Sequence, residues 1–354
     1  MAPRPHVVFV NTGWGRATSA RPAIEVRFQF LETAPLHLLN KLLQDEAYMW
    51  GHRLHWDISN IQRVIYQAAR RRVLPGVFAT DGDRAAGSVY YTGVGKDAVM
   101  GPLTIAPEYR DTDLGAKLTN FVVRRMRGAR LCNRIESHTP FIRESGVGSV
   151  LNDLGFNAVP RSFLTKSLDK VHLPRILAGI AIEPLIPRRL GEAAQVLHHS
   201  LAGSPDAIIN AGIDTVPGCQ RYLESLTESP ACGAFEPSAS AIATNGSGEA
   251  IGIVATTRVS QTRGLIGQIS VLPEHQACGV GRALMHHALH ALVSMGGRDV
   301  ALTVTEGNPA RKWYSRLGFR EQHSFDSYIW IDKDSGRRSP TRDPEDPSEV
   351  LLVH

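Results

Sequence analysis

Long apolar runs are missing from this sequence of 354 residues. A helix that crosses a bilayer needs about 18 or more consecutive, predominantly apolar residues, and no stretch of the chain meets this requirement. The N-terminal segment MAPRPHVVFVNTGW contains only a four-residue apolar run, which is too short for the apolar region of a secretory signal. We therefore expect a cytoplasmic protein without a membrane partner.

Cysteines and basic runs are also too sparse to indicate a disulfide framework, a metal site or a nucleic-acid partner. Cys132, Cys219, Cys232 and Cys278 lack the paired spacing that disulfide-rich and zinc-binding chains show. The net charge is only +5, and no dense Lys/Arg run is interleaved with aromatic residues, as a nucleic-acid-binding surface would require. We therefore predict neither a metal nor a nucleic-acid partner.

Length and composition instead indicate a globular chain of two domains with a polar tail. Hydrophobic residues make up 43% and charged residues 21% of the sequence, the usual balance of a globular protein. A chain of 354 residues suits two domains of roughly 150 residues each. The last segment, 333–354, is polar, charged and proline-rich. We expect it to be disordered, because it cannot bury enough apolar surface to offset the entropy of ordering.

The sequence between its two ends repeats itself. Ala79–Gly82 (ATDG) and Ala243–Gly246 (ATNG) are each followed by two strand-like segments and one helix-like segment. Further on, Leu154–Phe156 and Leu317–Phe319 both read LGF. The offset between the copies is 164 to 166 residues at the first landmarks and 163 at the last, and such regularity indicates a repeated fold. We predict two copies of one α/β or α+β fold, over residues 24–170 and 178–332.

The second copy contains a glycine-containing loop between a strand and a helix. The strand Gln268–Val271 ends before Pro273, and the loop Gln276–Gly281 (QACGVG) leads through Arg282 into a helical pattern. Glycines permit tight turns, and the free amides of a helix N-terminus form a site for a pyrophosphate. Taken alone, two such glycines are more often part of an ordinary turn.

A second motif, further along the chain, indicates what this loop binds. The strand–QxxGxG–helix unit resembles the cofactor motif of the GNAT superfamily of N-acetyltransferases, and Asn308–Phe319 resembles that family's second motif. With the repeat included, the resemblance covers roughly residues 24 to 331, in a layout similar to that of mycothiol synthase-like acetyltransferases. It implies two tandem GNAT-like domains, each a mixed, mostly antiparallel sheet flanked by helices.

The resemblance also implies a reaction, in which acetyl-CoA is the acyl donor and a primary amine, most simply of a small molecule, attacks the thioester directly. Tyr314 would protonate the departing thiolate as a general acid, and Asn308 would lie near the cofactor arm. The interval from Asn308 to Tyr314 is one residue shorter than the family's pattern. The remaining cofactor contacts are backbone groups of Ile269, Ser270 and Val271 for the arm, and of Gln276, Ala277, Cys278, Gly279, Val280, Gly281 and Arg282 for the pyrophosphate.

The sequence leaves the general base open. The strand position that often carries a glutamate in this family is Thr303 here. Glu306 follows three residues later and is the catalytic carboxylate that we predict, although an exposed loop carboxylate is the plainer interpretation. Glu274 and His275 adjoin the cofactor loop, and a chain of water molecules is a further alternative.

The first copy lacks two features of the second. Its loop, Arg110–Gly115, has Asp113 in place of the first glycine, and Leu151 takes the position of Tyr314. A carboxylate at Asp113 repels a pyrophosphate and can itself cap the helix N-terminus. We therefore expect the first copy to be catalytically silent. A non-catalytic acyl-CoA-binding module and an aminoacyl transferase of the cell-wall-assembly type remain alternatives for the whole chain. No motif identifies the acceptor amine or the oligomeric state.

Overall fold

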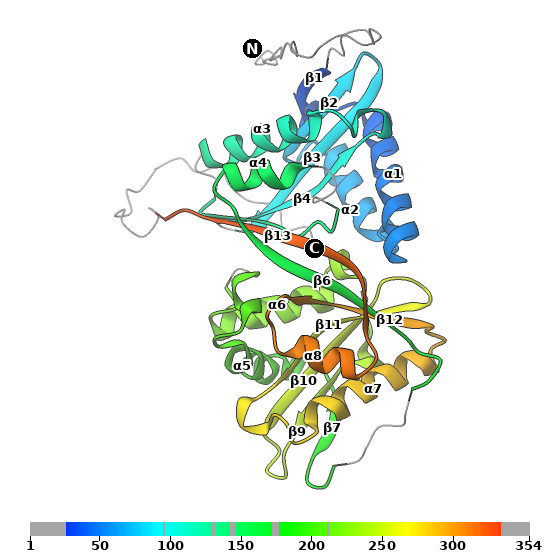
Figure 1. Ribbon diagram of the computed structural model, residues 1–354, viewed down its shortest axis with the longest axis vertical. Helices are drawn as coiled ribbons and strands as arrows, with labels where there is room; N and C mark the ends of the chain where they lie inside the picture. The colour runs from blue at the N-terminus through cyan, green and yellow to red at the C-terminus, as the bar shows by residue number, and fades with distance from the viewer. Residues whose placement is uncertain are drawn as a thin grey trace. The chain divides into compact units, whose positions relative to one another are not determined.

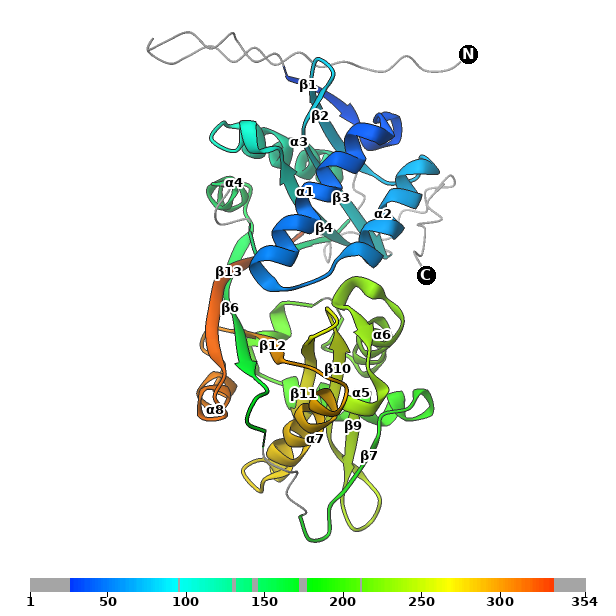
Figure 2. The ribbon, with the colours of Figure 1, turned by 90° about the vertical axis from the view of Figure 1, so that its right-hand side faces the viewer.

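The computed structural model describes residues 26–94, 96–128, 132–141, 146–171, 177–210 and 212–333, and they form two compact units (Figures 1 and 2). Unit 1 contains the described residues of Met1–Met49, Gln62–Ala158 and Asp326–Val353, and unit 2 contains Trp50–Ile61 and the described residues of Val159–Phe325. The predicted tail lies outside the described residues except for Lys333, and so does Pro174, which falls between the two predicted copies. None of the described helices is both long and apolar enough to cross a bilayer.

Unit 1 is a sheet with a pair of helices on each face. Its strand order is β1-β2-β3-β4-β5-β13, antiparallel except where β4 pairs with β5. Helices α1 and α2 lie on one face, and α3 and α4 on the other (Figure 1). The elements are β1 (Val26–Phe30), α1 (Leu36–Leu54), α2 (Ser59–Arg70), β2 (Gly76–Asp81), β3 (Arg84–Val94), β4 (Asp97–Ile105), α3 (Leu114–Gly128), β5 (Arg134–Ser137), α4 (Val147–Asp153) and the end of β13 (Arg320–Ile331).

Unit 2 has the same plan. Its strand order is β13-β6-β12-β11-β10-β9-β7, with β8 paired to β10, and β11 runs parallel to β12. Helices α5 and α6 cover one face and α7 and α8 the other (Figure 2). The elements are β6 (Asn157–Ser167), β7 (Ala181–Pro184), α5 (Leu190–Leu201), α6 (Val216–Glu228), β8 (Ala234–Phe235), β9 (Ala241–Thr244), β10 (Ala250–Arg258), β11 (Arg263–Val271), α7 (Val280–Ser294), β12 (Asp299–Thr305), α8 (Ala310–Arg316) and the start of β13.

The central strand of unit 2, β10, carries apolar side chains on both of its faces, and helices cover both. Every residue of β10 from Ile251 to Thr257 is buried, as expected for a strand between two helical layers. Val254 faces the cluster formed by α7 and α8, whereas Ile253 and Ala255 face α5 and α6. Helical layers thus pack against both faces of the sheet.

The two sequence copies exchange their last strands. Strand β6 follows α4 in the chain but pairs antiparallel with β12 of unit 2, with Phe163 opposite Thr303. The end of β13 pairs with β5 of unit 1, with Tyr328 opposite Ser137. The compact units therefore do not follow the expected division into 24–170 and 178–332 along the chain.

The turns that follow α4 and α8 have the same hydrogen bond and the same glycine conformation, as expected for a repeat. After α4, the Phe156 N–H donates to Leu151 O at 3.0 Å, and after α8 the Phe319 N–H donates to Tyr314 O at 3.1 Å. The glycine between each pair has a positive φ, 81° at Gly155 and 91° at Gly318, a conformation that glycine adopts without strain. The two halves thus share one fold, and the predicted α/β class with mostly antiparallel sheets is confirmed.

Candidate functional site

Two parallel strands of unit 2 part shortly after they begin. β11 and β12 pair at only three positions, the last being Leu265 opposite Ala301. Beyond this point β11 continues to Val271 beside β10, and β12 continues to Thr305 beside β6. A wedge therefore opens between the carboxyl ends of β11 and β12. Ile269, Ser270 and Val271, which we predicted to contact the cofactor arm, belong to the unpaired side of β11.

A β-bulge lies where the wedge opens. On β11, Gln268 pairs with Ala255 and Ile266 with Thr256, so Gly267 has no partner on β10. The Tyr222 hydroxyl of α6 donates to the carbonyl of Gly267 at 3.3 Å. A bulge interrupts the ladder and redirects backbone groups, and here the Gly267 carbonyl is directed toward α6.

The predicted cofactor loop forms the N-terminus of α7. Ala277 and Gly279 both have positive φ, 60° and 95°, and Gly279 caps the helix without any side-chain hydrogen bond. The first helical bond runs from the Ala283 N–H to Gly279 O at 3.0 Å. Helix geometry therefore leaves the amides of residues 280–282 without an intrahelical acceptor, and together with the helix dipole they favour an anion.

The same loop is tied to the wedge by Gln276 and leaves space at Gly281. The Gln276 Nε2 donates to Val271 O at 3.0 Å, so a hydrogen bond joins the loop to the end of β11. A Cβ added at Gly281 would lie 3.6 Å from Val271 and 3.7 Å from Trp313, which is ordinary van der Waals contact. Protein packing therefore does not by itself require a glycine at this position. Cys278 is exposed in this loop.

Tyr314 lies on α8, with 8% of its surface exposed. Its ring contacts those of Trp313 and Phe319, with centroids 5.1 and 5.9 Å away. Burial raises the pKa of the Tyr314 hydroxyl, and the negative charge of Asp206 raises it further. The hydroxyl is therefore neutral near pH 7 and retains a proton that it can donate.

The acidic group next to Tyr314 is Asp206, which the sequence did not reveal. It lies in the short 3-10 helix Pro205–Ile208 between α5 and α6. Its carboxylate accepts hydrogen bonds from Thr305 Oγ1 and from Asn308 Nδ2. The one signal for this segment in the sequence is Ser204, a typical helix-capping residue. Its hydroxyl accepts from the Asp206 N–H at 3.2 Å. A cap does not reveal that the Asp206 side chain bonds Thr305 and Asn308.

The other predicted polar residues have varied surroundings. Asn308 Oδ1 accepts from the Ala310 N–H at 2.8 Å, so both ends of its amide already have protein partners. Glu306 is exposed, and its backbone N–H donates to Pro160 O at 2.9 Å. Glu274 is exposed in the 3-10 helix that precedes the loop, and His275 is half-buried there.

The loop of the first copy differs from that of the second in the partner of one backbone amide. Arg110 Nε donates to Ile105 O at 3.3 Å, just as Gln276 does to Val271 in the second copy. The Leu114 N–H, however, is bonded to Thr112 Oγ1 at 3.3 Å. The expectation that the Asp113 carboxylate caps this helix is wrong, because that carboxylate pairs instead with Lys117 one turn along the helix, at 2.8 Å.

Two further positions distinguish unit 1 from unit 2. Leu151, which replaces Tyr314, is fully buried. Gly101, the counterpart of Gly267, lies against the ring of Tyr90, which comes within 2.3 Å of the position that a Cβ would take. The register of β3 and β4 shifts between Val89 and Tyr91, so unit 1 also has a bulge here, and an aromatic ring covers it.

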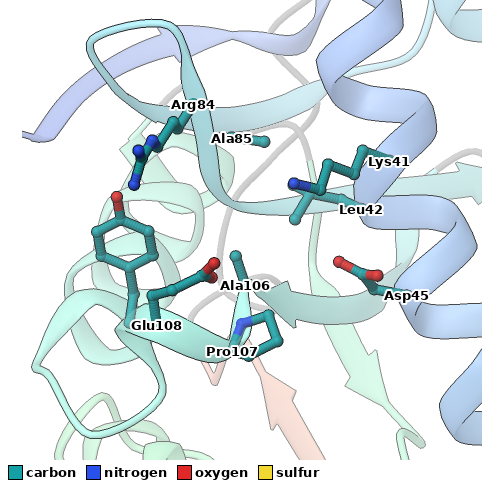
Figure 3. Close-up of a pocket in the computed structure, with 9 residues that line it drawn as sticks. Lys41, Leu42, Asp45, Arg84, Ala85, Ala106, Pro107 and Glu108 are labelled. Atoms are coloured by element: carbon teal, nitrogen blue, oxygen red, sulfur yellow. The ribbon is translucent and has the colours of Figure 1, made fainter.

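Unit 1 also has a polar hollow of about 490 Å³ beside its loop (Figure 3). Lys41 and Asp45 reach it from α1, and Arg84 and Glu108 reach it from the opposite side. The neighbouring Tyr109 hydroxyl donates to Asp81 at 2.9 Å. In the described parts of the chain, no cluster of three or more His, Cys, Asp or Glu side chains has the arrangement of a metal site.

Comparison with known proteins finds similarity in the second copy. Residues 216–319 match the acetyltransferase (GNAT) family. The [ribosomal protein bS18]-alanine N-acetyltransferase of Haemophilus influenzae is 38% identical over 53 residues, which are 15% of this chain and 36% of that protein. The match thus spans about a third of the relative's length.

Solved structures share the fold over most of the chain. A tandem GNAT protein from the clavulanic acid biosynthesis pathway has a TM-score of 0.60 and 14% identity, over 88% of this chain and 100% of that one. A GCN5-related N-acetyltransferase from Sphaerobacter thermophilus has a TM-score of 0.56 and 16% identity, over 73% of this chain and 80% of that one. At these identities the comparison shows a shared fold.

Proposed function

We propose that this chain, which carries a GNAT-family acetyltransferase domain over residues 216–319, transfers an acetyl group from acetyl-CoA to a primary amine of a small molecule. The observation that carries the proposal is the parting of β11 from β12 after Leu265 and Ala301, with the open amides of the α7 loop at the same end of β11. This pairing of a wedge with an anion site suits a long cofactor that ends in a pyrophosphate.

In the proposed reaction the amine nitrogen attacks the thioester carbonyl directly. A C–N bond forms, the C–S bond breaks, and the electron pair of that bond stays on the sulfur. The neutral Tyr314 hydroxyl protonates the thiolate, and a carboxylate accepts the proton that the amine loses. Backbone N–H groups near the Gly267 bulge are suited to stabilise the oxyanion.

We propose Asp206 as the carboxylate that receives the amine proton. Thr305 and Asn308 fix its position at the end of β12, and its charge influences the hydroxyl of Tyr314. Glu306 stays the alternative that the sequence predicted, and its exposure on a loop counts against it. Substitution of each carboxylate separates the two, as described in the Discussion.

We propose that unit 1 is a catalytically silent scaffold. Three of its features oppose cofactor binding or proton transfer: the capped amide of Leu114, the aromatic cover over Gly101 and the leucine at position 151. The first sequence copy also supplies strand β6, which completes the sheet of unit 2.

The activity is tested by incubating the full chain with acetyl-CoA and a panel of amines, with thiol release as the readout. Amine-dependent release of free CoA is the expected result. Tight binding of acetyl-CoA without release for any amine would instead favour a non-catalytic acyl-CoA-binding module.

A further inference from the structure

Arg161 is an incompletely satisfied cation at the wedge of unit 2. It lies on β6 opposite Thr305, and its Nη2 donates to Thr303 Oγ1 at 2.8 Å. Its Nε is shielded from solvent and has no acceptor in the described part of the chain. Its guanidinium carbon lies 5.8 Å from the ring centroid of Phe325. A buried guanidinium N–H without an acceptor is costly, so this side chain is prepared for a ligand that accepts hydrogen bonds.

Asp206 contributes a negative charge to the surroundings of Arg161. Burial lowers the pKa of Arg161, and the charge of Asp206 opposes that shift. The two side chains are near each other, yet the Asp206 oxygens are used by Thr305 and Asn308. The site therefore contains a guanidinium and a carboxylate. Thr303 bonds the guanidinium of Arg161, and Thr305 and Asn308 bond the carboxylate of Asp206.

Strand alternation places both groups on the acceptor side of the sheet. On β12, Leu302 and Val304 pack into the cluster of α7 and α8, so Thr303 and Thr305 point to the opposite face. On β6, Leu164 belongs to that same cluster, and Arg161, three residues before it, faces the other way with Thr303.

The two faces of the sheet thus have different roles. The loop with free amides begins α7 on one face, and Arg161, Asp206 and Tyr222 gather on the face of α5 and α6. A donor bound at the α7 loop would approach from the other face, so it would not occupy Arg161 and Asp206. The acceptor therefore meets Arg161 and Asp206 as it reaches the wedge.

We propose that the acceptor amine also carries a carboxylate, which Arg161 binds while Asp206 faces the amino group. Guanidinium matches carboxylate in planar, two-bond geometry, and the adjacent positive and negative groups complement an amino acid-like zwitterion. This inference rests on the proposed acetyl transfer and narrows its substrate class.

The test compares amino acids with their own carboxamides as acceptors in the thiol-release assay. Each pair has the same side chain and differs only in the carboxylate. Because a carboxamide lowers the basicity of the neighbouring amine, each pair is compared at a pH at which both amines are protonated. We expect wild type to favour the acid in kcat/KM by roughly 10- to 100-fold, the range for a charge-assisted hydrogen bond.

The variant Arg161→Gln should erase this preference by lowering kcat/KM for the acid far more than for the carboxamide. Arg188→Gln, which removes an equal charge from an exposed position, is the matched control and should keep the preference. Equal rates of wild type on acids and carboxamides would overturn the inference and leave acetyl transfer intact. An equal loss for both substrates in Arg161→Gln would overturn it as well.

A binding experiment gives an answer that does not depend on turnover or on folding of the variant. Calorimetry of wild type should detect N-acetylated amino acids, which resemble the product, and should show at least 10-fold weaker binding of their carboxamides. Equal affinity for the two would contradict the role of Arg161. Absence of thiol release with every amine would instead count against the proposed function itself.

Discussion

The Asn308 amide donates a hydrogen bond of 2.5 Å to the carboxylate of Asp206, although 102 residues separate them in the chain. This bond joins the segment between α5 and α6 to the start of α8, the helix that carries Tyr314. A proton donor and a proton acceptor are thereby held on neighbouring elements at one end of the wedge. We therefore expect substitutions of Tyr314 and of Asp206 to affect catalysis in different ways.

Tyr314→Phe should lower kcat by roughly 10²-fold, because the general acid is lost. The affinity for acetyl-CoA should stay within about twofold, since the ring remains in the core and only the hydroxyl is removed. Steady-state kinetics and calorimetry measure the two quantities. Tyr109→Phe, which removes the hydroxyl bonded to Asp81 in unit 1, is the control and should have wild-type turnover. Wild-type turnover of Tyr314→Phe would make Tyr314 a structural residue.

Asp206→Asn should lower kcat by about 10²- to 10⁴-fold, the range for loss of a general base, because the amide cannot accept the amine proton. Glu306→Gln should remain within about twofold of wild type, since that side chain is exposed and shares no bond with Asp206 or Tyr314. The two variants are compared with the same amine. The reverse ranking would identify Glu306 as the base, as the sequence suggested.

Glu136 provides a pH test of the exchanged strand in unit 1. Burial raises the pKa of its carboxyl, but the hydrogen bond and charge of His138, together with Arg134, outweigh burial and hold the pKa below its usual 4.5. The His138 Nδ1 in turn lies 3.0 Å from Ser327 Oγ on β13. A carboxyl with a depressed pKa stabilises the fold above its unfolded pKa, and this stability is lost as the pH falls through the folded pKa.

Glu136→Gln should therefore reduce the free energy of unfolding at pH 7 by about 1–3 kcal/mol. The deficit should shrink as the pH falls below 4.5, because the wild-type carboxyl is then protonated too. Urea denaturation across this range measures it. Glu108→Gln, an exposed change in unit 1, should have no such effect. A deficit that does not change with pH would mean that the carboxylate charge is not what stabilises unit 1.

The sequence predicted the parts of the site that are local. A loop of fixed spacing before a helix, and a tyrosine before the LGF turn, are read directly from neighbouring residues, and the repeat supplies the element order. Asp206 and Arg161 could not be found this way. Their partners Thr305, Asn308 and Thr303 lie far along the chain, and no spacing rule connects them.

Strand exchange and the helix cap of unit 1 were missed for related reasons. A strand pattern predicts that β6 is a strand but not that its partner is β12, because pairing partners depend on tertiary structure. At the α3 N-terminus, Asp113 and Thr112 are both good capping residues. Lys117, four residues after Asp113, attracts that carboxylate along the helix surface, and the Thr112 hydroxyl bonds the free amide instead.

The central claim is that acetyl-CoA binds once per chain, at the α7 loop of unit 2. Titration calorimetry of the full chain should give one site. Gly281→Val should weaken it by at least roughly 10-fold, since a branched side chain blocks close approach to the backbone, while the added Cβ itself makes only ordinary contacts. Gly115→Ala, its counterpart in unit 1, should leave binding unchanged. Two sites in wild type, or unchanged affinity in Gly281→Val, would contradict the account.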